Sequence, residues 1–332
     1  MNKSHAAFST RRRSIIAAWA VSLASPLLWA QTSDWPSKPI RLVVPSAAGS
    51  STDIFGRIFA EQFAKTFKQT VVVDNKPGSN GLIGNDVVAK SPADGYTLLF
   101  SYAGAVAMNQ ALRPTMPYDA VKDLQAIAQV GAGGNVLIVS PDFPAKTLKE
   151  FVALVNASPN KYNYASWGVG SGGHLTMEAL KMLTGMKINH VPYKTVGQIL
   201  TDIQGGIVSI GWADPTTTLP LHNAGKLRVL ASSGTKRQPG TPDIPTIAEA
   251  GYKFGVDSWF GLFAPAGTPL PIVRRVHDEV NRILQLPEIQ TRFTALNIPE
   301  TPIKSVDQFA QTVREDIQAW TAVVKANDIR AE

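Results

Sequence analysis

The 332-residue sequence contains no cysteine, and this absence limits how the chain can be stabilised. A protein without cysteine has no disulfide framework, so its stability must come from a large hydrophobic core. Its five histidines show no H-x-x-x-H spacing, and without thiolates a zinc site is not expected. The sequence therefore gives no reason to expect a metal or any other cofactor.

Motifs of the common hydrolase and nucleotide sites are also missing. No serine lies in G-x-S-x-G, because Val169 stands two residues before Ser171 and Asp53 stands two residues after Ser51. No G-x-x-x-x-G-K-[ST] segment occurs. We expect a protein that is not an enzyme. A Ser-His-Asp arrangement built on one of the histidines remains formally open, so a secreted α/β hydrolase acting on carboxylate esters is the alternative.

Residues 168–173 do match G-x-G-x-x-G, and they lie between a predicted strand and a predicted helix. A dinucleotide-binding fold would also need an acidic residue about twenty positions further on, where it would bind the ribose hydroxyls. Tyr193 and Lys194 stand there instead. Nucleotide binding is therefore not expected.

Only one long apolar run is present, at residues 15–28, and it has the features of a secretory signal peptide. Lys3 and the arginines at positions 11–13 precede it, the small residue Ala30 closes it, and it is too short to span a bilayer. We expect cleavage after Ala30 and export to the periplasm by the Sec or the twin-arginine route. With no second such run, the mature protein is expected to be soluble.

The charge balance indicates no basic surface for nucleic acid. Residues 1–30 hold four of the 32 Lys and Arg residues and none of the 25 Asp and Glu residues, which leaves 28 against 25 and a net charge of +3. The remaining charges are interspersed along the sequence rather than gathered in runs. A nucleic-acid partner is therefore not expected.

The chain is organised around a strand, a small-residue loop and a helix at residues 40–67. Residues 40–44 are nearly all apolar and rich in β-branched types, as in a strand buried on both faces of a parallel sheet. Residues 46–52 are small, and from Asp53 onward apolar residues recur at helical spacing. The free N–H groups of a helix N-terminus favour anions. An ordinary turn capped by Ser or Asp remains the alternative.

The same pattern recurs in the second half, with a strand at 162–166, a small-residue loop at 168–173 and a helix from His174. Strands and helices alternate around these units, which predicts parallel βαβ units in two α/β halves, with a ligand at the carboxyl ends of the strands. Further strands are expected at 70–73, 96–101, 124–130, 136–140, 188–194, 207–212, 227–232 and 258–264, and further helices at 82–90, 147–156, 196–204, 271–284, 287–295 and 306–326.

Several ordered motifs make the sequence similar to one known family. They are Trp35-Pro36, Gly49 with Thr52-Asp53, Asn75-Lys76-Pro77-Gly78, Asp94-Gly95-Tyr96-Thr97-Leu98-Leu99, His190-Val191-Pro192-Tyr193-Lys194, Pro242-Asp243-Ile244-Pro245-Thr246, and Trp259 with Ala264-Pro265-Ala266-Gly267-Thr268-Pro269. Over essentially the whole mature chain, the sequence resembles the Bug (TctC-like) family, the extracytoplasmic solute receptors of tripartite tricarboxylate transporters.

The resemblance implies an α/β fold of the two-lobed periplasmic-binding-protein (Venus flytrap) type, in which each lobe is a mostly parallel sheet flanked by helices. We expect residues 31–129 and 263–332 to form the first lobe and residues 130–262 the second. The resemblance also implies a small carboxylate ligand, held by loop backbone amides and waters rather than by an arginine clamp. The expected partners are this ligand and the membrane components of the transporter, and the chain is expected to be a monomer.

The expected ligand site combines family positions with aromatic side chains near them. Its first-lobe part is Ser46, Ala48, Gly49, Ser50, Ser51, Thr52, Asp53, Gly78, Ser79, Asn80 and Tyr102, and its second-lobe part is Gly168, Gly170, Ser171, Gly172, His174, Tyr193, Lys194, Trp212 and Asp214. Simpler roles stay open for three of them: Asp53 as a helix cap, Lys194 as a solvated charge and Trp212 as a core residue.

The ligand itself cannot be inherited, because the sequence departs from the family in its loops. Ser46 replaces the usual aromatic residue, and Ser50 and Thr195 replace glycines. Two helix N-termini that face each other offer one anion site per lobe, which favours a dicarboxylate. Flat apolar walls would favour a ring, such as a phthalate isomer. The candidate wall residues are Tyr102, Trp167, Trp212 and Trp259.

Overall fold

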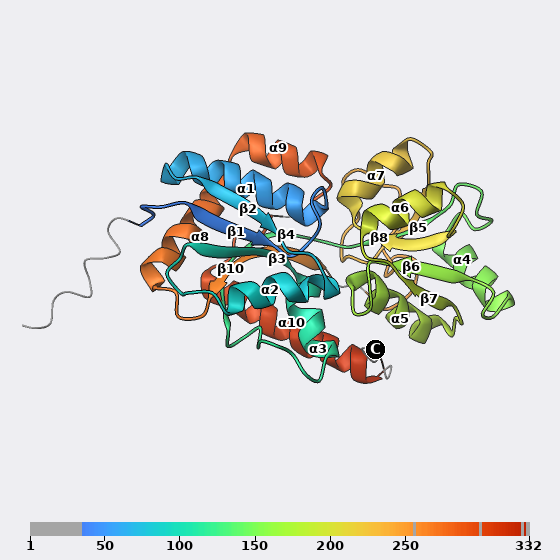
Figure 1. The fold of residues 1–332 in the computed structure, drawn as a ribbon. Coiled ribbons are helices and arrows are strands. Elements are labelled where there is room, and N and C mark those ends of the chain that lie inside the picture. Colours follow the sequence, from blue (N-terminus) through green and yellow to red (C-terminus); the bar gives the residue numbers. More distant parts are fainter. Residues whose placement is uncertain (1–34, 255–256, 299–300, 327–328, 330–332) are drawn as a thin grey trace, which may run out of the picture.

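The computed structural model describes residues 35–254, 257–298, 301–326 and 329 of the chain. These residues form two lobes, each with a five-stranded β-sheet and flanking helices (Figure 1). None of the described helices is long and apolar enough to cross a membrane. The predicted signal peptide, residues 1–30, lies outside the described residues.

The first lobe contains both ends of the described chain. Its strands are β1 (Ile40–Val44), β2 (Val71–Asn75), β3 (Thr97–Tyr102), β4 (Leu124–Gly133) and β10 (Ser258–Pro265). Its helices are α1 (Ser51–Phe67), α2 (Leu82–Ala89), α3 (Asn109–Leu112), α8 (Leu270–Leu284), α9 (Pro287–Ala295) and α10 (Val306–Ala326), with the short helices η2 (Ser79–Gly81) and η3 (Gly104–Met108). The strand order is β2-β1-β3-β10-β4, in which β1 is parallel to β2 and β3 and only β10 is antiparallel to its neighbours.

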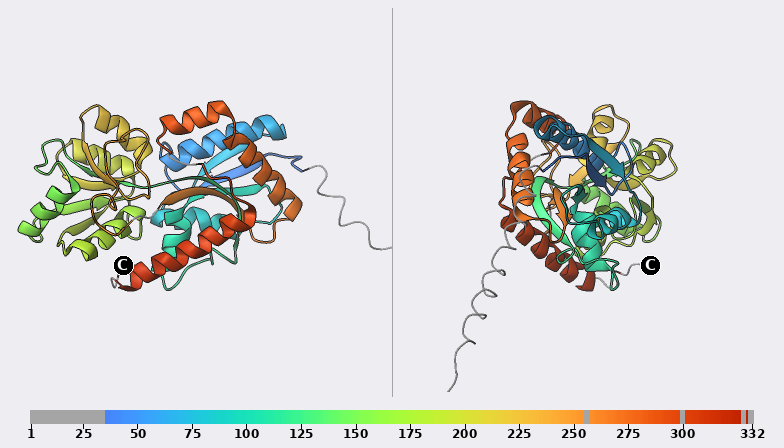
Figure 2. Two further views of the ribbon diagram at one scale, coloured as in Figure 1. Left: turned by 180° about the vertical axis from the view of Figure 1, so that it is seen from behind. Right: turned by 60° about the vertical axis from the view of Figure 1, so that its left-hand side comes forward.

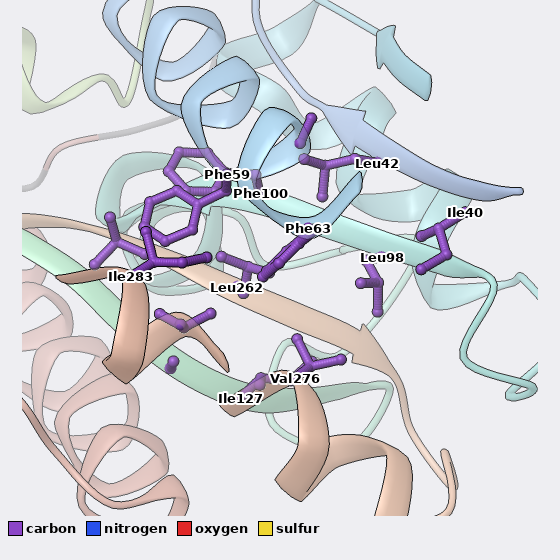
Figure 3. Packing of buried hydrophobic residues seen from close by; sticks show 14 of the residues in the cluster. Ile40, Leu42, Phe59, Phe63, Leu98, Phe100, Ile127, Leu262, Val276 and Ile283 are labelled. Carbon is purple, nitrogen blue, oxygen red and sulfur yellow. The ribbon is translucent and has the colours of Figure 1, made fainter. Parts of the chain in front are cut away.

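The core of this lobe explains why the first predicted strand and helix form (Figure 3). Ile40 and Leu42 on β1 are fully buried, and α1 places Phe59 and Phe63 against the sheet. The ring of Phe59 stacks on that of Phe100 from β3, with the ring centres 5.7 Å apart. Each such side chain contributes about 1.5–3 kcal/mol on burial, so this core supplies the stability that the missing disulfides cannot.

The second lobe has the same layout. Its strands are β5 (Val136–Val139), β6 (Asn163–Ser166), β7 (Asn189–Pro192), β8 (Ile210–Ala213) and β9 (Arg228–Ser232), and its helices are α4 (Leu148–Ala157), α5 (Gly172–Thr184), α6 (Val196–Gln204) and α7 (Pro215–Asn223). The strand order is β7-β6-β8-β5-β9, with β6 parallel to β7 and β8 and only β5 antiparallel to its neighbours. The fully buried Trp212 and Tyr164 anchor its core.

Helix α7 was not among the helices expected from the sequence, and its composition explains why. Pro215 stands in the first turn, where its missing N–H breaks no helical bond, and Asp214 caps the helix by accepting the N–H of Thr217 at 3.0 Å. Pro220 lies inside the helix. Threonine and proline are poor helix formers, so the helical signal in the sequence is weak.

The chain crosses between the lobes twice, at residues 134–135 between β4 and β5, and again after residues 247–254, which pack on the second-lobe core, before β10 begins. In each sheet the antiparallel strand is therefore the one that enters from the other lobe. At the crossing, a Cβ on Gly134 would overlap the backbone of Gly234. The predicted lobe boundaries at 129/130 and 262/263 stay a prediction. In the sheet itself, Ser258 of β10 pairs with Gly133 of β4, so residues 130–133 and 258–262 belong to the first-lobe sheet.

The lobes touch along one margin through apolar side chains. Met108 and Leu112 of the first lobe pack with Leu175 of the second, and Trp320 and Val324 of α10 complete the cluster. Figure 2 shows α10 running along the first lobe toward the second. The contact places η3 and α3 directly against the N-terminal turn of α5.

Candidate ligand site between the lobes

Two loops lie at the carboxyl ends of parallel strands, one on each lobe. The first loop, residues 46–53, connects β1 to α1, and the second loop, residues 167–174, connects β6 to α5. Both loops lie on the side of their lobe that faces the other lobe (Figure 1). Ligands of α/β proteins bind at such strand ends, so the position fits the site expected from the sequence.

The two loops end in the same helix cap. Ser50 and Ser171 are the N-cap residues, with nearly identical backbone angles of −70° and 162° and of −69° and 161°. Each serine Oγ accepts the backbone N–H three residues later, that of Asp53 or His174, and both bonds measure 3.3 Å. The helices thus begin at Ser51 and Gly172, two residues before the predicted starts, and Ser50 rather than Asp53 is the cap.

A glycine in the left-handed region precedes each cap. Gly49 has φ 79° and Gly170 has φ 77°, a region that residues with a Cβ rarely occupy. The N–H of Gly49 donates to Asp53 Oδ2 at 2.9 Å, and the N–H of Gly170 donates to His174 Nδ1 at 3.1 Å. Asp53 and His174 are both buried. They therefore support the loops from behind rather than line an open surface.

Asp53 has a full set of donors. Arg57 Nε donates to Oδ2 at 2.9 Å and Asn75 Nδ2 donates to Oδ1 at 2.9 Å. Burial alone would raise the pKa of Asp53, but the hydrogen bonds from Arg57, Gly49 and Asn75 hold it below its ordinary value. Asn75 also donates to the carbonyl of Ser46. It was not among the predicted site residues, although its place at the end of β2, beside the first loop, could have indicated it.

The backbone amides of the loops differ in how open they are. In an α-helix the first N–H groups have no intrahelical acceptor, and this applies to Ser51 and to Gly172. At matched positions the loops differ at the glycine and the cap: Gly49 is exposed and Ser50 half-buried, whereas Gly170 and Ser171 are buried; residues 51–53 and 172–174 are buried in both loops. A Cβ on Gly172 would lie 2.8 Å from Asn135 Nδ2 and 3.7 Å from Met108 Cε of the first lobe. The second loop is thus covered at its glycine and cap, where the first is more open.

Asn80 connects the two lobes directly. Its Nδ2 donates to the carbonyl of Gly170 at 3.0 Å and to that of Gly104 at 3.1 Å, and its Oδ1 accepts the hydroxyl of Tyr102 at 3.1 Å. Asn80 itself is buried with φ 52°, whereas the neighbouring Ser79 is exposed. The predicted residues Asn80, Tyr102 and Gly170 therefore meet in one hydrogen-bonded cluster.

Other predicted residues lie elsewhere. The hydroxyl of Tyr193 donates to Asp202 on α6 at 2.8 Å, and burial together with Asp202 raises the pKa of Tyr193 to about 12. Lys194 is exposed. Trp212 and Trp259 are buried in the cores of their lobes, which leaves neither as an accessible wall. The aromatic candidates that remain half-buried are Tyr102 and Trp167.

Asp214 lines a small cavity beside the lobe crossing. The cavity measures about 40 Å³ and is bounded by residues of both lobes, among them Asn135, Gln238, Phe260 and Asn297. Burial raises the pKa of Asp214. A cavity of this size with polar side chains at its edge can hold an ordered water. At its edge a second bond joins the lobes, from Thr216 Oγ1 to the carbonyl of Leu296 at 2.7 Å.

No group of three or more histidine, aspartate or glutamate side chains that could hold a metal ion occurs in the described part of the chain. The chemistry available at the lobe interface is thus that of backbone amides, hydroxyls, side-chain amides and two aromatic rings. Such groups bind and orient a solute.

Comparison with known proteins agrees with this fold. The sequence matches the family described as "TctC: Tripartite tricarboxylate transporter family receptor" over residues 55–329. It is 35% identical to Protein BugT of Bordetella pertussis over 294 residues, which are 88% of this chain and 90% of the relative.

Three solved structures share the fold. The periplasmic binding protein BugD has 31% identity and a TM-score of 0.83, over 90% of this chain and all of the other. Rpa4515 of R. palustris with adipate has 32% identity and a TM-score of 0.85, over 89% and 99%. MatC of Rhodopseudomonas palustris with bound malate has 32% identity and a TM-score of 0.81, over 87% and 99%.

Fold and family together define a two-lobed periplasmic solute-binding protein, as predicted. The chain belongs to the TctC family of tripartite tricarboxylate transporter receptors, which includes the Bug proteins. Its family and structural neighbours are solute-binding receptors, so the chain is a receptor and not an enzyme, and the hydrolase alternative is not supported. The sheets are mixed, with four strands in one direction and one reversed in each, which agrees with the expected mostly parallel arrangement.

Proposed function

We propose that this receptor captures a small organic carboxylate between its lobes and delivers it to the membrane components of a tripartite tricarboxylate transporter. The observation that carries this proposal is the pair of loops with one hydrogen-bond pattern, each at a helix N-terminus and each on a different lobe. A helix N-terminus carries about half a positive charge and unpaired N–H groups. A carboxylate can therefore be bound by the backbone without an arginine.

A dicarboxylate fits this arrangement best, because each loop can take one end of the molecule. The adipate and malate bound by two structural neighbours are both diacids and support this choice. The first loop is open in the described structure, so it would receive the first carboxylate. The second loop is covered by the first lobe when the lobes are together, as in the described structure, so the other carboxylate would enter while they are apart.

A thermal-shift panel tests the ligand class. It contains adipate, malate, phthalate isomers, citrate, benzoate and amino acids, each added to the mature protein. A ligand at a hundred times its dissociation constant stabilises the protein by about 2.7 kcal/mol, which raises Tm by roughly 2–4 °C at this size. We expect the diacids to give the shift. A response to monoacids or amino acids, with none to any diacid, would refute the proposal.

Closure of the lobes is tested by small-angle scattering. Two chain crossings between the lobes allow a hinge motion. We expect the radius of gyration to fall when the best diacid of the panel is added. An unchanged radius at saturation would contradict ligand-driven closure.

An aromatic ligand would need a flat wall, which Trp167 and Tyr102 can offer beside the loops. We propose that a phthalate isomer binds with its ring against Trp167 and Tyr102. In that case Trp167→Leu should remove the thermal shift given by phthalate and keep most of the shift given by adipate. Equal losses for both ligands would exclude a stacking role for Trp167.

Delivery to a transporter is tested in cells. A strain that lacks this chain and keeps its transporter membrane proteins should lose uptake of the radiolabelled diacid. A plasmid copy of the chain should restore that uptake. Uptake that persists without the chain would contradict the delivery role.

A further inference from the structure

Behind the second loop lies a pair of stacked histidines, His174 and His190, whose side chains take no part in binding a carboxylate through backbone amides. The rings of His174 and His190 stack with their centres 4.1 Å apart and their planes 15° apart. His190 Nε2 lies 2.7 Å from Ser166 Oγ. His174 Nδ1 accepts the N–H of Gly170. A backbone N–H can only donate, so Nδ1 carries no proton and the proton of the neutral ring is on Nε2.

Gly170 is held from both sides. Its N–H is bound by His174 in its own lobe, and its carbonyl is bound by Asn80 of the first lobe. The first-lobe side chains packed near the loop, Met108 and Leu112, are uncharged. By accepting the Gly170 N–H, Nδ1 of His174 therefore holds Gly170 in the position where its carbonyl meets Asn80 of the first lobe.

We propose that His174 is the positioning residue of the second loop and that it makes carboxylate binding weaken as the pH falls. This inference rests on the proposed function. A second proton can add to the ring only at Nδ1. The protonated ring would then present an N–H to the N–H of Gly170, so the loop must move and its contact with Asn80 breaks.

The other titratable groups around the ring do not imitate this effect. Glu178 lies 3.9 Å from His174 Nε2 and is held by Lys181 at 2.8 Å and by the hydroxyl of Tyr164 at 2.9 Å. Burial, with the nearby charges of His174 and Lys181, lowers the pKa of His190 to about 3, and burial beside Glu178 raises the pKa of Tyr164. His190 stays neutral and Tyr164 stays protonated at any pH between 5 and 8.

The first loop lacks this sensitivity. Asp53 occupies the position of His174, and its pKa lies below the ordinary value, so it still accepts the N–H of Gly49 at pH 5. An opposing effect exists at the second loop, because an imidazolium would attract an anion. That attraction leaves the loop in place, whereas the lost acceptor changes the loop itself. The direction of the pH effect separates the two.

The test compares dissociation constants at several pH values. Adipate and malate are titrated by calorimetry at pH 7.5, 6.5 and 5.5 into the wild-type protein and His174→Asn. Asparagine Oδ1 takes the place of Nδ1 and accepts the Gly170 N–H without titrating. His222→Asn on α7 is the matched control. Titration of the ligand itself is common to all three proteins and cancels in their ratios.

We expect the wild-type Kd to rise by up to tenfold per pH unit below the point where His174 takes up its proton, relative to His174→Asn, and His222→Asn to follow the wild type. Parallel pH dependence in wild type and His174→Asn, or tighter wild-type binding in acid, would overturn the proposal. If neither diacid binds at pH 7.5, the proposed function fails instead, and the comparison is run with the panel compound that binds.

A second measurement uses only the wild-type protein, so the test does not depend on His174→Asn folding correctly. Nitrogen NMR of labelled histidine should show His174 Nδ1 unprotonated at pH 7.5. Saturation with the bound compound should lower the pH at which His174 becomes charged. A protonation midpoint that does not move on binding would overturn the proposal.

Discussion

The first and second loops share one backbone design and differ in what supports and covers it. Each has a left-handed glycine, a serine cap and, three residues after the cap, a side chain that accepts the glycine N–H. In the first loop this acceptor is the carboxylate of Asp53, and in the second it is the neutral ring of His174. At the glycine and the cap the first loop is more open than the second, where side chains of the other lobe lie against the chain. The shape of the loop thus needs an acceptor at this position but not a charge.

This difference assigns separate roles to the loops. A loop held by an ion and open to solvent is ready to receive a ligand with the lobes apart or together. A loop that is covered by Asn80 and Met108 depends on the position of the other lobe. We therefore expect substitutions in the first loop to act mainly on local stability, and substitutions in the second to act mainly on closure.

The largest effect is expected for Gly170→Ala when it is compared with Gly49→Ala. Both place alanine in the left-handed region, which costs about 1–2 kcal/mol. At Gly49 no heavy atom lies within 4 Å of the new Cβ, whereas at Gly170 the Cβ would overlap Leu112 of the other lobe. The overlap adds about 1–3 kcal/mol to the closed form alone. Kd for the diacid should therefore rise at least about fivefold more in Gly170→Ala, as measured by calorimetry. An equal rise in Kd for both variants would contradict the claim that the first lobe covers Gly170 but not Gly49.

The next effect is the acid sensitivity of the first loop. Asp53→Asn should lower the free energy of unfolding at pH 7 by about 1–3 kcal/mol, because a buried charged acceptor is lost. The pKa of Asp53 is depressed, so its contribution is present above the unfolded value of 3.8 and is lost as the pH falls through the folded value. Urea unfolding at pH 7 and pH 3.5 should show the deficit of the variant shrink in acid.

Asp74→Asn is the control for that experiment. Asp74 pairs with Arg41 at 2.6 Å, but both side chains are partly exposed. Exposed ion pairs contribute about 0–1 kcal/mol. A loss for Asp74→Asn as large as that for Asp53→Asn would show that the first loop is not specially stabilised.

A smaller effect is expected for Thr216→Val, which removes the bond from Thr216 to the carbonyl of Leu296 across the lobes. A neutral hydrogen bond contributes about 1 kcal/mol, so Kd should rise roughly fivefold. The free energy of unfolding of the ligand-free protein should change less. A change in stability with no change in Kd would show that this bond does not act through closure.

The smallest effect is expected for Lys194→Ala. The side chain is exposed, so its charge is screened at physiological ionic strength. Kd at 150 mM salt should change by less than about threefold, with a larger change at low salt. A tenfold loss at 150 mM salt would place Lys194 in contact with the ligand.

The sequence predicted the recurrence of the loops but not how they are supported. The small residues, the preceding apolar strands and the helical spacing are local signals, and all three were visible. Helical spacing in the sequence places the helix starts at Asp53 and His174, two residues after the positions where the structure begins them. The spacing of Ser50 and Asp53 is that of a capping box, in which a residue three positions after the cap bonds back, so this error could have been avoided.

Other features depend on contacts between distant residues. The side chain of Asn80 meets Gly170 only after both lobes have folded, so no local pattern in the sequence predicts this contact between the lobes. Trp212 is an aromatic residue at the end of a strand, and such a residue fits a core as well as a binding wall. Only packing decides this, and it places Trp212 in the core of the second lobe.

The central claim is that each loop binds one carboxylate of the same ligand. Its most direct test is calorimetry at pH 7.5 with adipate or malate, whichever gives the larger thermal shift, and with the monoamide of the same acid. A hydrogen bond to a charged group contributes about 1.5–3 kcal/mol and one to a neutral group about 0.5–1.5. The monoamide should therefore bind roughly tenfold more weakly than the diacid. Equal dissociation constants for the two compounds would contradict the claim.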